Sequence, residues 1–147
     1  MLRLVPILPT DNGKNVCGDD SESLSIFDMT LDFYKRIELT PPWICYFVYD
    51  QERIVGSAGF KGKPVNNRVE IAYGTMDKYR HKGIGAQTCG LLIGRSLASD
   101  PSVVITARTL PEENYSTRIL KKNGFSLLGV VIDPEDGKVW EWEYQDS

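Results

Sequence analysis

A glycine-rich stretch between an expected strand and an expected helix constrains the fold of this chain most. It covers residues 79–88 and reads Tyr-Arg-His-Lys-Gly-Ile-Gly-Ala-Gln-Thr, with Gly83 and Gly85 two positions apart. Arg68–Thr75 before it alternates like a strand, and apolar residues recur at helical spacing over 84–95. A helix start offers unpaired N–H groups and a positive dipole end, which glycine lets a ligand approach closely. The natural ligand is a phosphate or pyrophosphate.

The glycine spacing separates this stretch from two other phosphate-binding motifs. A P-loop needs two glycines separated by four residues and then Lys and Ser or Thr, and no such run exists in this chain. The dinucleotide fingerprint needs a third glycine three residues after Gly85, where this chain has Thr88. What remains is Arg-x-x-Gly-x-Gly, filled by Arg80, Gly83 and Gly85. On its own, this motif is also consistent with a glycine-rich loop that starts a helix and binds no ligand.

The charge of the chain limits its partners. Its net charge is −3, which does not favour nucleic acid or anionic membranes, so we expect neither as a partner. Arg80, His81 and Lys82 form a local positive group just before Gly83. A positive group on an acidic protein suits a small anionic ligand better than a nucleic-acid duplex. The His81 backbone, rather than its ring, is expected to do the binding.

Cysteine usage and the N-terminal segment indicate a cytoplasmic protein. Cys17, Cys45 and Cys89 are odd in number, match no zinc or CxxC spacing, and have one histidine in the chain to assist them. We therefore expect reduced thiols and no metal site. Met1–Pro9 is apolar but interrupted by Arg and Pro, and no run of about 18 apolar residues follows, so neither a signal sequence nor a membrane span is expected.

The order of elements predicts one α+β (mixed α/β) domain over residues 1–147. Strands are expected at 2–8, 43–49, 53–60, 68–75, 102–108, 125–132 and 138–144, and helices at 21–37, 83–98 and 115–123. Residues 10–20 are expected to be a loop, Ser21 or Ser23 to cap the first helix, and Gly124 to end the last. The result is a twisted mixed sheet of about six to seven strands flanked by helices.

The strand before the glycine-rich stretch has one face of small residues. Strand alternation puts Glu70, Ala72 and Gly74 together on this face. Two small side chains beside a carboxylate leave room for a ligand. A solvated strand residue is an equally good interpretation of Glu70.

The order of elements and the Arg80–Gly85 motif resemble the GNAT superfamily of N-acetyltransferases over nearly the whole chain. A second signature covers residues 111–116 and 120–125, where an Asn/Ser-bearing helix start precedes a Lys-x-Gly-Phe end. Within the superfamily, residues 69–74 and 42–43 look most like the branch that includes the ribosomal-protein N-terminal acetyltransferases.

The resemblance implies an acyltransferase that moves an acetyl group from acetyl-CoA, its cosubstrate, to a primary amine. The amine belongs to a small molecule or a protein N-terminus and attacks directly in a ternary complex. The family's central strand splays from its neighbour, and backbone N–H groups there polarise the thioester carbonyl. The residues implied in binding acetyl-CoA are Tyr73, Gly74, Thr75, Arg80, His81, Lys82, Gly83, Ile84, Gly85, Ala86 and Asn114.

The resemblance also implies groups that handle protons. The amine must be neutral to attack, so a base takes its proton, often through water. Glu70 is the candidate base because it precedes the expected acetyl-CoA contacts on the small-residue face. Many family members use a tyrosine as general acid toward the thiolate, and this chain has Leu120 at that position. Either Tyr115 or Ser116 replaces it, or the thiolate leaves without a positioned acid.

A second departure concerns the start of the last helix. Ser116 falls on the family's serine, but Glu113 stands where the family has asparagine, and Asn114 is displaced by one position. Together with Leu120, this departure favours an alternative function, a non-catalytic module that senses acyl-CoA or regulates a partner protein.

The resemblance does not identify the acceptor. Specificity is expected in residues 10–42 and 61–68, which carry no recognisable motif. Glu141 and Glu143 would suit a cationic amine, although a solvated strand face explains them equally well. A homodimer formed through the last strands is possible by fold analogy.

Overall fold

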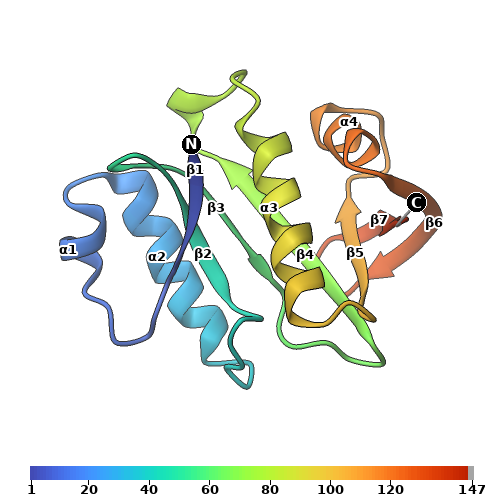
Figure 1. The fold of residues 1–147 in the computed structure, drawn as a ribbon, viewed down its shortest axis with the longest axis horizontal. Coiled ribbons are helices and arrows are strands. Elements are labelled where there is room, and N and C mark those ends of the chain that lie inside the picture. Colours follow the sequence, from blue (N-terminus) through green and yellow to red (C-terminus); the bar gives the residue numbers. More distant parts are fainter. Residues whose placement is uncertain (146–147) are drawn as a thin grey trace.

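A mixed sheet forms the centre of the computed structural model, in which residues 1–145 are described (Figure 1). Its seven strands are β1 (Leu2–Pro6), β2 (Cys45–Asp50), β3 (Arg53–Phe60), β4 (Arg68–Thr75), β5 (Val104–Thr109), β6 (Phe125–Asp133) and β7 (Gly137–Tyr144). They are arranged in the order β1-β2-β3-β4-β5-β7-β6. β4 and β5 pair in parallel, and the other neighbouring strands pair antiparallel. The predicted mixed sheet is therefore confirmed.

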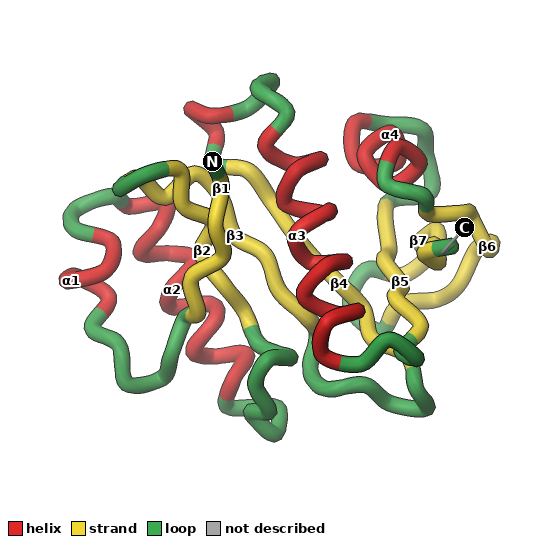
Figure 2. The backbone as a smooth tube through the Cα atoms, in the orientation of Figure 1, coloured by secondary structure: helices red, strands yellow, loops and turns green. Residues whose placement is uncertain are grey.

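Helices cover both faces of the sheet (Figure 2). They are α1 (Gly13–Cys17), α2 (Ser21–Tyr34), α3 (Ile84–Ser99) and α4 (Tyr115–Lys122). α1 and α2 supply Cys17 and Phe27 to one buried cluster, while α3 and α4 supply Leu92 and Leu120 to a larger one on the other face. Within residues 1–145, no helix combines the length and apolar character that crossing a bilayer requires.

Two predictions about the first helical segment were wrong. Residues 10–20 were expected to be a loop, yet they contain α1, whose first turn is capped by the side chain of Asn12. α2 is capped by Asp20, which accepts a hydrogen bond from the Ser23 N–H at 3.1 Å, and not by Ser21 or Ser23. α1 was missed because five residues provide too few positions to show helical periodicity.

The strands around the glycine-rich stretch match the predicted ranges closely. β4 spans the predicted residues, and Gly124 has φ 91° just after α4, the left-handed conformation expected there. A single turn of 3₁₀ helix at Asp77–Tyr79 leads from β4 into the glycine-rich loop, and α3 begins at Ile84. The β4–α3–β5 unit therefore carries the loop at the end of a central strand.

Candidate active site

The central strands separate next to the glycine-rich loop. β4 pairs with β5 from Arg68 to Ile71, opposite Val104 to Ala107, while β4 continues along β3 as far as Thr75. On its other edge, β5 pairs with β7 from Thr106 onwards. The sheet consequently opens between the last half of β4 and the end of β5.

Backbone groups of β4 are directed into this opening. The Glu70 carbonyl accepts from Lys61 N–H at 2.9 Å and the Met76 N–H donates to the Val55 carbonyl at 2.8 Å, both on the β3 side of β4. Because backbone direction alternates along a strand, Tyr73 directs its N–H and carbonyl towards the opening, as does Thr75. These groups are free to pair with a ligand that lies along β4 like an added strand.

Gly74 differs from its two neighbours. Its backbone faces β3, where it pairs with Ser57, and a side chain built on it would meet no atom within 4 Å. Gly74 therefore leaves open space on the Glu70 face of the strand. The small-residue face predicted from the alternation of Glu70, Ala72 and Gly74 does line a cavity.

The glycine-rich loop ends in free amide groups at the start of α3. Gly83 has φ 76° and His81 has φ 66°, so both residues are in left-handed conformations. The first helical hydrogen bond runs from Gln87 N–H to the Gly83 carbonyl, which leaves the N–H groups of residues 84–86 available at the positive end of the helix. A side chain on Gly83 would meet no atom within 4 Å, so the loop is open to a ligand.

Other residues of the loop have structural contacts. A side chain at Gly85 would come within 2.8 Å of Ile119 Cδ1, so Gly85 allows α3 and α4 to pack closely. Arg80 forms an ion pair with Asp77 at 3.0 Å. Lys82 lies over the ring of Tyr79, with its ammonium 5.9 Å from the ring centre.

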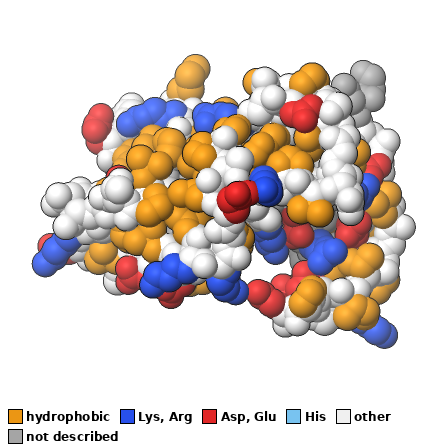
Figure 3. All heavy atoms as spheres, turned by 90° about the horizontal axis from the view of Figure 1, so that it is seen from below, with side chains coloured by type: hydrophobic (Ala, Val, Ile, Leu, Met, Phe, Trp, Pro, Cys, Tyr) orange, Lys and Arg blue, Asp and Glu red, His pale blue; other side chains and the backbone are white. Residues whose placement is uncertain are grey.

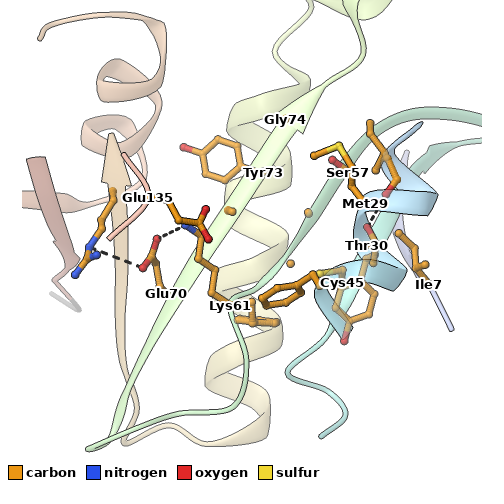
Figure 4. A pocket seen from close by; sticks show the side chains of 18 of the residues that line it. Ile7, Met29, Thr30, Cys45, Ser57, Lys61, Glu70, Tyr73, Gly74 and Glu135 are labelled. Atoms are coloured by element: carbon orange, nitrogen blue, oxygen red, sulfur yellow. Dashed lines mark hydrogen bonds and ion pairs between the residues drawn. The ribbon is translucent and has the colours of Figure 1, made fainter. Parts of the chain in front are cut away.

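Glu70 lines three cavities: one of about 220 Å³, which Arg68 and Glu141 also line, and two others. The smaller of these last two, of about 110 Å³, lies in the opening and is lined by residues of β4, β5 and α4 that include Ser116. The larger, of about 590 Å³, lies between α2 and the β6–β7 turn. Both are lined by Glu70, Tyr73 and Arg108. Figure 4 shows Glu70, Tyr73 and Gly74 along β4 at the larger cavity.

Glu70 is held between two cations that were not predicted as site residues. Lys61 Nζ lies 2.9 Å from the Glu70 carboxylate, and Arg108 Nε lies 3.9 Å from it (Figure 4). Arg108 also pairs with Asp133 at 2.9 Å and with Glu141 at 3.2 Å. The hydrogen bonds that Arg108 donates to Asp133 first, and then to Glu141, raise the pKa of Arg108. No motif in the sequence marks these partners.

The remaining candidates take different places. Ser116 lines the opening, whereas Tyr115 is 45% exposed and its ring lies 6.3 Å from the ring of His81, beside the glycine-rich loop. Asn114 caps α4 by accepting a hydrogen bond from Thr117 N–H at 3.0 Å. The Asn114 side-chain oxygen is therefore already engaged within the protein.

The chemistry of two carboxylates and one thiol is limited by their surroundings. Glu141 and Glu143 pair with Arg68 at 3.4 and 3.1 Å, so they are not free carboxylates for a cationic acceptor. Cys45 lines the larger cavity, and burial raises the pKa of its thiol to about 11, which keeps it protonated at neutral pH. Among the described residues, no group of three or more His, Cys, Asp or Glu side chains is placed to hold a metal ion.

A family model of the acetyltransferase (GNAT) domain matches residues 17–126. The chain belongs to the GNAT family of acetyltransferases. The GNAT chain is also 35% identical to the uncharacterized N-acetyltransferase YjdG of Bacillus subtilis (strain 168) over 96 residues. That match covers 65% of this chain and 54% of YjdG, so the chain spans about half the length of this curated relative.

Solved structures share the GNAT fold at low sequence identity. RimL, a ribosomal L7/L12 alpha-N-protein acetyltransferase in complex with coenzyme A, matches with a TM-score of 0.68 and 15% identity, over 97% of this chain and 92% of RimL. The aminoglycoside acetyltransferase AAC(6')-Ib in complex with coenzyme A matches with a TM-score of 0.60 and 20% identity, over 69% of this chain and 65% of its own. The predicted fold and family are confirmed.

Proposed function

We propose that this GNAT domain transfers an acetyl group from acetyl-CoA to a primary amine of a small molecule or a protein N-terminus. The observation that carries the proposal is the opening between β4 and β5, with free backbone groups at Tyr73 and Thr75 and with the glycine-rich loop beside it. The presence of coenzyme A in two structures of the same fold supports this assignment.

The chain offers acetyl-CoA two kinds of contact. The N–H groups of Ile84, Gly85 and Ala86 bind the pyrophosphate at the start of α3, with Arg80 and Lys82 close by. The remaining contacts are the backbone groups of Tyr73, Thr75, His81 and Gly83. Gly74 and Asn114 are also implied by the family resemblance, but the Gly74 backbone pairs with Ser57 of β3 and the Asn114 side-chain oxygen caps α4. Acetyl-CoA supplies the thioester, and a backbone N–H at Tyr73 or Thr75 stabilises charge on its carbonyl oxygen.

Glu70 is proposed to accept the proton of the amine, directly or through a water molecule. It lies where the opening meets the larger cavity, so it borders both the thioester and the acceptor. The ammonium of Lys61, 2.9 Å away, holds the Glu70 carboxylate at this place. Ser116 has a hydroxyl, lines the opening and is proposed to donate towards the departing thiolate. Tyr115 lies beside the loop and is the weaker candidate for that role.

A second candidate function is a non-catalytic acyl-CoA sensor. The observation that favours it is the engagement of the Glu70 carboxylate by both Lys61 and Arg108, which an amine would have to displace to reach it. A sensor would bind acetyl-CoA and show no turnover with any amine.

A homodimer stays a prediction. β6 is an edge strand of the sheet, and Val130 and Ile132 on it are 58% and 69% exposed. Sedimentation at two protein concentrations would test whether a second copy covers this edge.

Thermal-shift titration tests the proposed function first. A ligand that binds only the folded state raises the melting temperature by mass action, so acetyl-CoA and CoA should raise it in a concentration-dependent way and NAD should not. Thiol release with a panel of amines then separates enzyme from sensor. No shift at millimolar acetyl-CoA would reject both functions, and a shift without thiol release would favour the sensor.

A further inference from the structure

The larger cavity has an apolar wall supplied by α2. Ile26, Met29 and Phe33 line the cavity at helical spacing, while Phe27 and Tyr34 are buried in the core. α2 therefore has a second apolar stripe that is only partly covered: Ile26 and Phe33 pack at the edges of the buried clusters, and Met29 is 67% exposed. Figure 4 shows Met29 and Thr30 on the side of α2 that faces the cavity. An apolar stripe kept at a cavity indicates a ligand with apolar surface.

The sheet completes this apolar surface. From the sheet, Cys45, Gly59 and Ala72 face the same cavity, beside the buried Ile7. The side chains of Tyr46, Ala58 and Phe60 alternate to the opposite face, where Arg95 of α3 lies over the Tyr46 ring. On the face seen in Figure 3, hydrophobic side chains gather in one area, with acidic and basic side chains around it. A volume of about 590 Å³ is in the range of small-molecule sites, so the cavity has room for a sizeable apolar group attached to the reacting amine.

The opposite wall is charged, but its charges are already balanced. Three acids line it, and each has a basic partner among the lining residues: Glu70 with Lys61 at 2.9 Å, Asp133 with Arg108 at 2.9 Å, and Glu135 with Arg36, just after α2, at 3.7 Å. Among the described lining residues, no carboxylate is left over for a bound cation. A ligand with several positive charges would have to break these pairs.

We propose that the acceptor is a primary monoamine whose body is apolar, such as an aromatic ring on a short alkyl chain. The apolar wall of α2 holds the body, and the amine nitrogen lies towards Glu70 and the opening. An apolar surrounding disfavours an ammonium, so it favours the neutral amine that attacks the thioester. This inference rests on the proposed function, and the amine is carried by a free small molecule or by the N-terminus of a peptide with an aromatic first residue.

The first test compares acceptors by acetyl-CoA-dependent thiol release. The set is 2-phenylethylamine, ethanolamine and spermidine, with tripeptides that begin with phenylalanine or serine. We expect kcat/KM for an aromatic acceptor to exceed that of its polar counterpart by about tenfold or more. Reaction with 2-phenylethylamine or with the phenylalanine tripeptide tells whether the acceptor is a free amine or a peptide N-terminus. Equal or better use of spermidine, ethanolamine or the serine peptide would overturn the inference.

A variant of the apolar wall provides the matched test. Met29 is 67% exposed, so Met29→Ser should leave the fold intact, and Leu128→Ser removes a similarly exposed apolar side chain on β6, outside the cavity. We expect M29S to raise KM for the aromatic acceptor about five- to tenfold, without changing KM for acetyl-CoA. L128S should change neither. An equal effect of the two variants would contradict the proposed contact.

Binding measurements separate failure of the inference from failure of the proposed function. Each amine is added to the protein saturated with CoA, and the melting temperature is recorded. A rise with an aromatic acceptor but not with spermidine supports the inference even if no acetyl group is transferred. If neither 2-phenylethylamine nor the phenylalanine tripeptide raises the melting temperature, the inference is wrong, whatever acetyl-CoA does.

Discussion

The ammonium of Lys61 lies 2.9 Å from the carboxylate of Glu70, where the opening between β4 and β5 meets the larger cavity. The Glu70 carbonyl also accepts the backbone N–H of Lys61, so the two residues are joined twice. Lys61 follows β3 directly and Glu70 lies on β4, and the antiparallel pairing of these strands brings them together. The carboxylate that is proposed to accept the proton of the amine is therefore already engaged by a cation.

Replacing Glu70 tests its role as base. Glu70→Gln keeps the side-chain size but removes the proton acceptor, so we expect kcat to fall by about a hundredfold. The shift in melting temperature with acetyl-CoA should be unchanged. Glu143→Gln is the control, because Glu143 pairs with Arg68 and lines none of the three cavities at Glu70. Similar losses of kcat in the two variants would show that Glu70 acts through the charge network alone.

Gly85 should be required for packing as well as for access to the loop. Its added Cβ would lie 2.8 Å from Ile119 Cδ1, so Gly85→Ala should lower the free energy of unfolding by about 1–3 kcal/mol. Ile119→Val removes that carbon and should recover part of the loss in the double variant. Chemical denaturation of both single variants and the double variant measures this coupling. Strictly additive losses would contradict the predicted contact.

Asn114 should contribute to stability more than to acetyl-CoA binding. Its side chain caps α4, so Asn114→Ala should cost about 1 kcal/mol of unfolding free energy. Asn12→Ala removes the equivalent cap of α1, which is remote from the opening, and serves as the control. We expect both variants to bind acetyl-CoA like the parent protein. Weaker binding in N114A alone would assign Asn114 the contact that the family resemblance implies.

Asp133 should make stability depend on acid pH. Hydrogen bonds from the Glu135 N–H first, and then from Arg108, lower the pKa of Asp133 from 3.8 to about 2. Its stabilising contribution is therefore complete above about pH 4 and is lost as the pH falls to about 2. Asp133→Asn should melt at a lower temperature than the parent at pH 7, with the difference closing between these values. Asp136→Asn, in the same turn, should show no such closing.

The strands and the two longest helices, α2 and α3, were predictable because their apolar side chains repeat at a regular period. β4 and α3 match their predicted ranges to within a residue at nearly every end. α1 was missed for the opposite reason, since five residues show no period. The cap at Asp20 was missed because the serines beside it are equally common caps.

Part of the site was visible in the sequence because its residues are neighbours in the chain. The loop before α3 and the open face of β4 follow from local rules about glycine and strand alternation. Lys61, Arg108 and the apolar stripe of α2 were not visible. Each comes from a different element, and its place at the cavity depends on strand pairing and helix packing.

The sequence by itself determined the elements, their order, the family and the glycine-rich turn, because these depend on patterns among residues close in the chain. Only the tertiary structure decided which charges are paired. Glu141 and Glu143 looked available to a cationic acceptor, yet they pair with Arg68, 73 and 75 residues away in the chain. Strand register determines such pairs, and register emerges only when the whole sheet has formed.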